Sequence, residues 1–276
     1  MTRTKSLERY PQPASAAAER TVIRTSPAGL ATARVAIPGP GHDVPAYVAR
    51  PEGAGTLPVV LVLSEAFGLH PYVEDVTRRF AHAGYLAVAA DLMALQGDPD
   101  DFDDVGRLVT ELLQHVPDEQ VMSDLDAVHD WAVANGGDAG RVGVNGFSWG
   151  GRWTWLYAAH RRVAAAVSWY GVLDDAASNL QPDRTLFPRH PIDLAGVLRT
   201  PVLGLYAGRD AVIPAATVEA MRSALAARPS PEPEVEFVVY PEAVHGFFAD
   251  YRDDYSPADA PAAWARALDW LREHGV

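Results

Sequence analysis

The sequence predicts an α/β protein with a doubly wound, mostly parallel β-sheet and an antiparallel N-terminal hairpin. Short apolar runs recur along the chain, and segments with helical periodicity lie between them from residue 58 to the C-terminus. Continuous apolar runs are expected of strands that are buried on both faces, as in a parallel sheet covered by helices. In such a sheet the ligand site lies at the carboxyl ends of the strands.

The N-terminal part is expected to hold an arm and a hairpin. Residues 1–28 contain prolines, charges and small residues but no long apolar run, so we predict a flexible or loosely docked arm. Residues 31–37 and 44–48 alternate apolar with small or polar residues around a Pro-Gly-Pro-Gly turn. This pattern is typical of two antiparallel strands. Because no linker interrupts the rest, residues 29–276 are predicted to form one domain.

The remaining elements alternate between strands and helices. The apolar runs that predict parallel strands are residues 58–63, 86–90, 142–144, 164–169, 202–206 and 235–240. Helical periodicity marks residues 72–83, 105–116, 121–132, 149–159, 217–227 and 262–273. In the third of these segments apolar residues recur at spacings of 4, 3 and 4, which places a stripe on one side of a helix.

Composition and charge argue against several classes of protein. The formal net charge of -13 disfavours a nucleic-acid partner, which would require a clustered basic surface. The absence of cysteine excludes disulfides, thiolate metal sites and a cysteine nucleophile. No apolar stretch reaches the roughly 18 residues of a membrane span. We therefore expect no membrane association and a cytoplasmic location, while the oligomeric state is left open.

An acidic group ahead of residue 105 raises the question of a metal site. Its members are Asp98, Asp100, Asp101, Asp103 and Asp104. They lack the fixed spacing of a cation-binding loop, and acidic residues before a helix are favoured by its dipole. We therefore predict no metal.

The motif that indicates chemistry is Gly146-Phe147-Ser148-Trp149-Gly150, a G-x-S-x-G pattern between a predicted buried strand and a predicted helix. Glycines on both sides of the serine allow the two backbones to approach where a Cβ would clash. The serine is then held in a strained elbow with its hydroxyl exposed. A glycine-rich helix start is the alternative interpretation. The context favours Ser148 as a nucleophile.

A serine hydroxyl needs a histidine to accept its proton and an acid to orient that histidine. In folds with this elbow the chain order is serine, acid, histidine. Asp210 follows the predicted strand 202–206, and His245 follows the last predicted strand. We predict Asp210 as the acid and His245 as the base, with Asp174 or Asp175 as alternative acids.

An oxyanion formed by attack on a carbonyl requires two backbone N–H donors. One should come from Trp149, directly after the nucleophile, and the other from the loop that follows the strand 58–63. In that loop we predict Ala66 as the donor, with Phe67 as the alternative. Of the aromatic residues around the elbow, Trp149 and Tyr170 are expected to line the pocket, and the others are expected in the core.

Taken together, the motifs resemble those of the dienelactone hydrolase (carboxymethylenebutenolidase) family over residues from roughly 30 to the end. The segments that carry the resemblance are Glu65 to Gly68, Arg79 to Ala81, Gly84-Tyr85, Asp91-Leu92, Gly146 to Trp155, Tyr170-Gly171, Pro201 to Asp210 and Tyr240 to Phe247. The resemblance implies an α/β-hydrolase fold, a small-molecule ester or lactone substrate, hydrolysis through an acyl-enzyme, and no cofactor.

Two departures from the family pattern concern chemistry and substrate. The family's archetypal nucleophile is cysteine, whose proton is taken by the glutamate that matches Glu65; a serine hydroxyl is too weak an acid for that route. Glu65 could instead tether the elbow or shape the pocket, together with Phe67 and Tyr170, or be a buried structural carboxylate. The family also has arginines, able to clamp a carboxylate, shortly after the Asp-Leu pair and the histidine. Here none follows Asp91-Leu92, and the first after His245 is Arg252, which argues against dienelactone itself as substrate.

Two other functions remain compatible with the same residues. A perhydrolase or acyl transferase would use the same triad but a different acceptor for the acyl group. A protein that keeps the fold for binding alone would not turn over an ester. The complete set of serine, acid and histidine favours the hydrolase.

Overall fold

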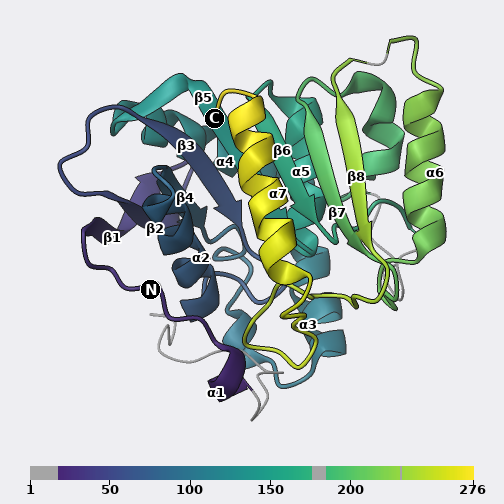
Figure 1. Cartoon of the computed structure of the whole chain (residues 1–276), viewed down its shortest axis with the longest axis horizontal. Coiled ribbons are helices and arrows are strands. Elements are labelled where there is room, and N and C mark those ends of the chain that lie inside the picture. Colours follow the sequence, from purple (N-terminus) through teal and green to yellow (C-terminus); the bar gives the residue numbers. More distant parts are fainter. Residues whose placement is uncertain (1–17, 176–184, 231) are drawn as a thin grey trace.

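The computed structural model describes residues 18–175, 185–230 and 232–276. Its eight-stranded sheet has the order β1-β2-β4-β3-β5-β6-β7-β8 (Figure 1). The strands are β1 (Leu30–Pro38), β2 (Asp43–Pro51), β3 (Leu57–Leu63), β4 (Leu86–Ala90), β5 (Gly137–Phe147), β6 (Ala165–Trp169), β7 (Val202–Ala207) and β8 (Val235–Tyr240). The predicted fold class is confirmed.

The antiparallel part of the sheet is confined to its N-terminal edge. β1 pairs with β2 in a register that runs from Leu30 opposite Pro51 to Pro38 opposite Asp43. β2 then pairs antiparallel with β4, and every later pairing, from β4–β3 through to β7–β8, is parallel. The predicted hairpin therefore lies beside the parallel sheet and leaves its carboxyl ends open.

Helices cover both faces of the sheet, as a doubly wound fold requires. The α-helices are α1 (Ala18–Thr21), α2 (Pro71–His82), α3 (Val105–Glu111), α4 (Asp118–Ala134), α5 (Trp149–His160), α6 (Ala215–Ala226) and α7 (Ala260–Glu273). Short 3₁₀ turns span Pro99–Asp101, Leu113–His115 and Pro191–Val197. α2 and α7 pack on one face of the sheet, and α4, α5 and α6 pack on the other (Figure 1).

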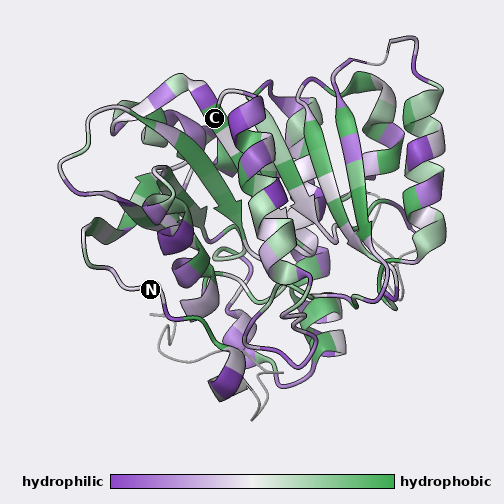
Figure 2. Cartoon of the chain, in the orientation of Figure 1, coloured by the Kyte–Doolittle hydropathy of each residue, from purple (hydrophilic) through white to green (hydrophobic). Residues whose placement is uncertain are grey.

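The two faces of the sheet bury two separate hydrophobic clusters. Along β3, Val59, Leu61 and Leu63 contribute to the cluster under α4 and α5. Val60 and Val62 contribute to the cluster under α2 and α7. Figure 2 shows the central strands as mainly hydrophobic, with hydrophilic residues on the outer sides of the helices. This two-sided burial explains why the parallel strands are continuous apolar runs in the sequence.

Two elements show the largest departures from the expected boundaries. β5 begins at Gly137, five residues before the apolar run that predicted it, because its first part pairs with Leu57 across an irregularity in the ladder. The helix expected over 105–116 ends at Glu111, since Leu112 adopts φ -124° and ψ -63°. A short 3₁₀ turn follows this break.

The described end of the N-terminal arm lies against α2. The backbone N–H and side-chain hydroxyl of Thr25 donate hydrogen bonds of 2.5 and 3.0 Å to the Asp75 carboxylate. The Arg78 guanidinium donates to the Thr25 carbonyl at 3.0 Å. Residues 1–17 lie outside the described part, so the domain division stays a prediction.

No helix within the described residues is long and apolar enough to cross a membrane.

Candidate active site

The site forms where the connections of two neighbouring strands diverge. β3 and β5 are adjacent and parallel, but β3 leads into α2 on one face and β5 leads into α5 on the other. In sheets of this kind ligands bind at the carboxyl edge, by the loops that follow two such strands. The loops concerned here are the one that begins at Ser64 and the turn at Ser148.

The turn at Ser148 is held tight by its glycines. A Cβ on Gly146 would lie 2.2 Å from the Gly150 carbonyl oxygen, and one on Gly150 would lie 2.4 Å from the Ser64 carbonyl oxygen. Ser148 has φ 50° and ψ -108°. Among the described residues other than glycine, only Ser148 and Tyr170 have a positive φ. Such a conformation costs on the order of 1–3 kcal/mol and persists only when the surroundings enforce it.

Ser148, His245 and Asp210 lie in one hydrogen-bonded series. The Ser148 Oγ lies 2.9 Å from His245 Nε2, and His245 Nδ1 lies 2.9 Å from Asp210 Oδ2. The second carboxylate oxygen of Asp210 accepts from the backbone N–H groups of Val212 and Ile213 at 2.8 and 2.7 Å. The Asp210 side chain is only 1% exposed, so its orientation is fixed on both sides.

The loops after β7 and β8 bring the acid and the histidine together. The Gly208 N–H donates to the Tyr240 carbonyl, and the Arg209 N–H donates to the Ala243 carbonyl. A Cβ on Gly208 would lie 2.5 Å from the Pro241 carbonyl oxygen, so only glycine allows this approach. The strand pairing thus continues into the two loops that carry Asp210 and His245.

Asp175, one of the alternative acids predicted from the sequence, pairs with a different histidine. Its carboxylate pairs with His190 at 2.5 Å, whereas Asp210 contacts His245.

Three backbone N–H groups are candidates for the two oxyanion donors. Trp149 is the first residue of α5, so its N–H has no partner within the helix. The N–H groups of Ala66 and Phe67 lie in the loop after β3. Within the described part of the chain none of these three N–H groups has an acceptor. Both residues considered for the second oxyanion donor therefore have an available N–H.

Glu65 lies buried between the β3 loop and the segment that follows His245. Its side chain is 2% exposed. The Tyr251 hydroxyl donates a hydrogen bond to Oε1, and the Arg252 guanidinium lies 3.9 Å from Oε2. Burial, with the negative charge of Glu65 as the next cause, raises the pKa of the Tyr251 phenol well above its ordinary value. Tyr251 thus stays a donor, and Glu65 links the loop after β3 to the segment that follows His245.

The Tyr170 ring packs against the His245 ring. Tyr170 follows β6 with φ 38°, and its ring lies edge-on to that of His245 at 5.1 Å between centroids. The side chain is fully buried, and its hydroxyl has no hydrogen-bond partner among the described residues. Burial, followed by the nearby Glu65 carboxylate, raises the pKa of this phenol well above its ordinary value. Tyr170 is therefore a protonated donor at the site.

Arg252 was missed as a site residue because its distance from His245 along the sequence is larger than the family pattern suggests. The chain turns back after Gly246, which has φ 81°. A Cβ on Gly246 would lie 3.0 Å from Arg252 Nη1, so the guanidinium lies beside the residue that follows the histidine. Its Nε is buried and has no acceptor among the described residues. The glycine at position 246, a residue type that readily adopts positive φ, is the one signal of this return in the sequence.

The remaining predicted pocket residues, Phe67 and Trp149, are buried and do not form a wall that is exposed to solvent. Phe67 and Trp149 are 7% and 5% exposed and belong to the same hydrophobic cluster. The Trp149 ring packs edge-on against Phe187 at 5.9 Å between centroids. Phe187 belongs to the loop between β6 and β7, of which residues 176–184 lie outside the described part. Trp153, Trp155 and Trp169 are fully buried, as expected of core residues.

The acidic group ahead of α3 acts in helix capping. The Asp104 carboxylate accepts from the Arg107 N–H at the start of α3, and Asp98 accepts from the Asp100 N–H at a 3₁₀ turn. Among the described residues, no group of three or more histidine, aspartate or glutamate side chains could hold a metal ion.

The fold and the strand, elbow, helix arrangement around Ser148 define an α/β hydrolase. The sequence model of the dienelactone hydrolase family matches residues 44–275. The chain therefore belongs to the dienelactone hydrolase family, and the predictions of the family and of a hydrolase are confirmed.

Individual relatives support the same assignment. A "Putative carboxymethylenebutenolidase" of Salmonella typhi is 47% identical over 266 residues, or 95% of each chain. A protein of the same description from Escherichia coli strain K12 is 45% identical over 95% of this chain and 94% of its own. The crystal structure of a "Putative Dienelactone Hydrolase" from Klebsiella pneumoniae has 47% identity and a TM-score of 0.81, over 88% of this chain and 99% of that one.

Substitution of Gly150 tests whether the elbow depends on close backbone contact. Gly150→Ala should lower the free energy of unfolding by about 1–3 kcal/mol, because the new methyl group would overlap the Ser64 carbonyl. Urea denaturation measures the change. In the control Gly55→Ala the methyl group meets nothing within 4 Å, and a change within about 0.5 kcal/mol is expected. Equal effects of the two substitutions would contradict the elbow geometry.

Proposed function

We propose that this chain hydrolyses a carboxylic ester or lactone through an acyl-enzyme intermediate on Ser148. The observation that carries the proposal is the series of two 2.9 Å contacts from Ser148 Oγ to His245 and from His245 to Asp210. Serine becomes a competent nucleophile when a neutral imidazole accepts its proton during attack. The protein groups that this reaction requires are these side chains and the backbone N–H donors, and water is the second reactant.

Acylation begins at the Ser148 hydroxyl. Oγ attacks the carbonyl carbon of the substrate while its proton passes to His245 Nε2. This requires the imidazole tautomer with hydrogen on Nδ1, which the contact with Asp210 Oδ2 selects. The Val212 and Ile213 N–H groups hold the carboxylate in the orientation that this hydrogen bond needs.

The carbonyl oxygen acquires negative charge in the tetrahedral intermediate. The N–H groups of Trp149 and Ala66 are the proposed donors to this oxygen, with Phe67 as the alternative to Ala66. Their support is that the start of α5 and the loop after β3 both offer N–H groups without acceptors in the described part of the chain. The start of α5 adds the partial positive charge of the helix dipole. Loss of one such donor typically lowers kcat by about 10²–10³-fold.

The intermediate collapses when His245 returns its proton to the leaving oxygen, which releases an alcohol or opens the lactone ring. Water then attacks the acyl group on Ser148, and His245 accepts a proton from this water. The second tetrahedral intermediate uses the same N–H donors. Its collapse releases the carboxylic acid and restores Ser148.

Active-site labelling with a fluorophosphonate tests the role of Ser148. The wild-type protein should be labelled and should hydrolyse p-nitrophenyl acetate, because Ser148 is paired with a base. Ser148→Ala should lose the label and nearly all turnover, about 10³-fold or more, with an unchanged unfolding midpoint. Labelling of the variant would reject Ser148 as nucleophile, and an unlabelled wild type would favour the binding protein. Hydrogen peroxide outcompeting water for the acyl group would favour the perhydrolase.

We further infer that the substrate carries a carboxylate near its scissile bond. The support is the Arg252 guanidinium beside Gly246, whose buried Nε has no acceptor among the described residues. Nη2 already donates to the Asp254 carboxylate at 2.9 Å, whereas Nη1 lies 3.9 Å from Glu65, beyond hydrogen-bond distance. We expect a substrate carboxylate to accept a charge-assisted hydrogen bond from Nη1. The relatives described as carboxymethylenebutenolidases bear the name of a lactone with a carboxymethylene substituent, which agrees with this inference.

A pair of esters tests this inference. Mono-p-nitrophenyl succinate carries a carboxylate, and p-nitrophenyl butyrate is a neutral ester with an acyl chain of the same length. Arg252→Gln should raise KM for the succinate ester by about 10- to 150-fold, from loss of a charge-assisted contact of about 1.5–3 kcal/mol, and leave KM for the butyrate ester near its wild-type value. An equal change for both esters would show that Arg252 acts only on the structure.

A further inference from the structure

We propose that Arg152 is a positioning residue that fixes the Trp149 N–H in the oxyanion site by clamping α5, the start of α4 and the segment 186–189 around the Trp149 ring. This inference rests on the proposed function, because it concerns the donor that would stabilise the acylation intermediate. Arg152 itself makes no proposed contact with the substrate.

Arg152 is joined to the first residue of α4 by a buried, two-pronged ion pair. Nη1 donates to Asp118 Oδ1 at 2.6 Å, and Nη2 donates to Oδ2 at 2.8 Å. The Arg152 and Asp118 side chains are 1% and 7% exposed. Removal of such charges from water opposes folding, and apolar residues of similar volume often serve stability equally well. A role in geometry would account for a charged pair at this position.

The same guanidinium also holds the loop segment that covers Trp149. Nη2 donates to the Arg189 carbonyl at 3.0 Å. The Asp118 N–H donates to the Leu186 carbonyl at 3.1 Å, so α4 grips the other end of this short segment. Between these two anchors Phe187 is fully buried. One side chain therefore connects three parts of the chain that are distant in sequence.

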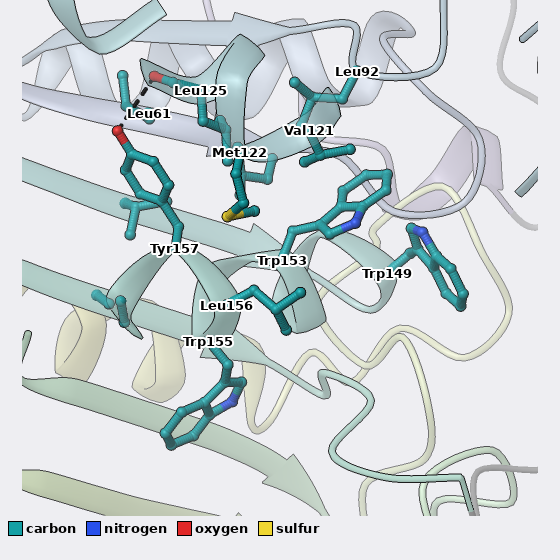
Figure 3. Close-up of a cluster of buried hydrophobic side chains, with 14 of the residues drawn as sticks. Leu61, Leu92, Val121, Met122, Leu125, Trp149, Trp153, Trp155, Leu156 and Tyr157 are labelled. Carbon is teal, nitrogen blue, oxygen red and sulfur yellow. Dashed lines mark hydrogen bonds between the residues drawn. The ribbon is translucent and has the colours of Figure 1, made fainter. Parts of the chain in front are cut away.

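The Trp149 ring is enclosed by this arrangement. The Arg152 guanidinium carbon lies 5.7 Å from the Trp149 ring centroid and 5.3 Å from the Phe187 centroid, within the range of cation–π attraction. The Trp153 ring packs edge-on against Trp149 at 6.1 Å. Figure 3 shows Trp153 directed toward Val121 of α4. The Trp149 side chain thus has little freedom, which limits rotation of its own backbone N–H.

The backbone transmits this restraint to the nucleophile. The Arg152 N–H donates to the Ser148 carbonyl at 3.0 Å and closes the first turn of α5. Ser148 is already strained, and in the proposed mechanism Trp149 must leave this strained turn with its N–H directed toward the oxyanion. Because catalysis is sensitive to displacements of about 1 Å, a looser first turn should weaken oxyanion binding more than substrate binding. Lysine cannot replace the planar fork that reaches two carboxylate oxygens and stacks on rings.

The test compares Arg152→Lys with a matched control at the other end of the same helix. Arg161, at the end of α5, pairs with Asp126 and Asp130 of α4. Arg161→Lys therefore perturbs an ion pair between the same two helices away from the elbow. For each protein we would measure kcat and KM with p-nitrophenyl acetate, inhibition by a trifluoromethyl ketone, and the unfolding midpoint. The ketone forms a tetrahedral adduct with serine whose oxyanion requires the N–H donors.

Arg152→Lys should lower kcat about 10- to 100-fold with KM within threefold of wild type, and should weaken the ketone by a similar factor. Arg161→Lys should leave kcat, KM and inhibition within twofold of wild type. Equal losses in the two variants, or wild-type inhibition in Arg152→Lys, would overturn the positioning role. If the wild type neither reacts with a fluorophosphonate nor hydrolyses the ester, the proposed function fails as well; if it does both, only this inference is at stake.

A second variant separates positioning from stability and covers the case in which Arg152→Lys does not fold. Arg152→Met combined with Asp118→Leu replaces both charges by apolar groups, so neither is left buried without its partner. The expected result is an unfolding midpoint near that of wild type with kcat still at least tenfold lower. Recovery of both the midpoint and kcat would show that the pair serves stability alone and would overturn the proposal.

Discussion

The close contact between β5, the turn at Ser148 and α5 is the constraint on which the rest of the site depends. A side chain at Gly146 or Gly150 would overlap backbone atoms, so strand and helix can approach only as glycines allow. This close contact forces Ser148 into a backbone conformation that is unfavourable for an isolated residue. The surrounding sheet supplies the restraint, because the Ser148 N–H donates to the Trp169 carbonyl at the end of β6. The parallel sheet therefore holds Ser148 in its strained backbone conformation.

The site is built from loops whose positions are set by strands and whose contacts are set by a few buried polar side chains. Asp210 and His245 are delivered by neighbouring strands, which makes their separation a property of the sheet. Glu65 then ties the loop after β3 to Tyr251 and Arg252. On the other side of the elbow the Arg152–Asp118 pair has the equivalent task for α4 and α5. Buried hydrogen bonds of this kind fix relative orientation, since an unpaired partner is costly.

The sequence predicts those parts of the structure that depend on local pattern and chain order. Parallel strands are legible because both faces are buried, and the positions of Asp210 and His245 follow from the ends of those strands. The place of Arg252 could not be predicted, because it depends on the path of a loop that turns at Gly246 and packs against Glu65. The break of the helix at Leu112 likewise lies within an uninterrupted helical pattern. Such features depend on packing between residues that are far apart in the chain, and this packing cannot be read from a single sequence.

The central claim is that Ser148 carries the acyl group during turnover. Rapid acid quenching of the protein mixed with excess p-nitrophenyl ester, followed by intact-mass spectrometry and peptide mapping, observes this intermediate directly. The account predicts a transient mass increase equal to one acyl group, located on the peptide that contains Ser148 and lost when the ester is consumed. Turnover without an adduct, or an adduct on another residue, would contradict the account.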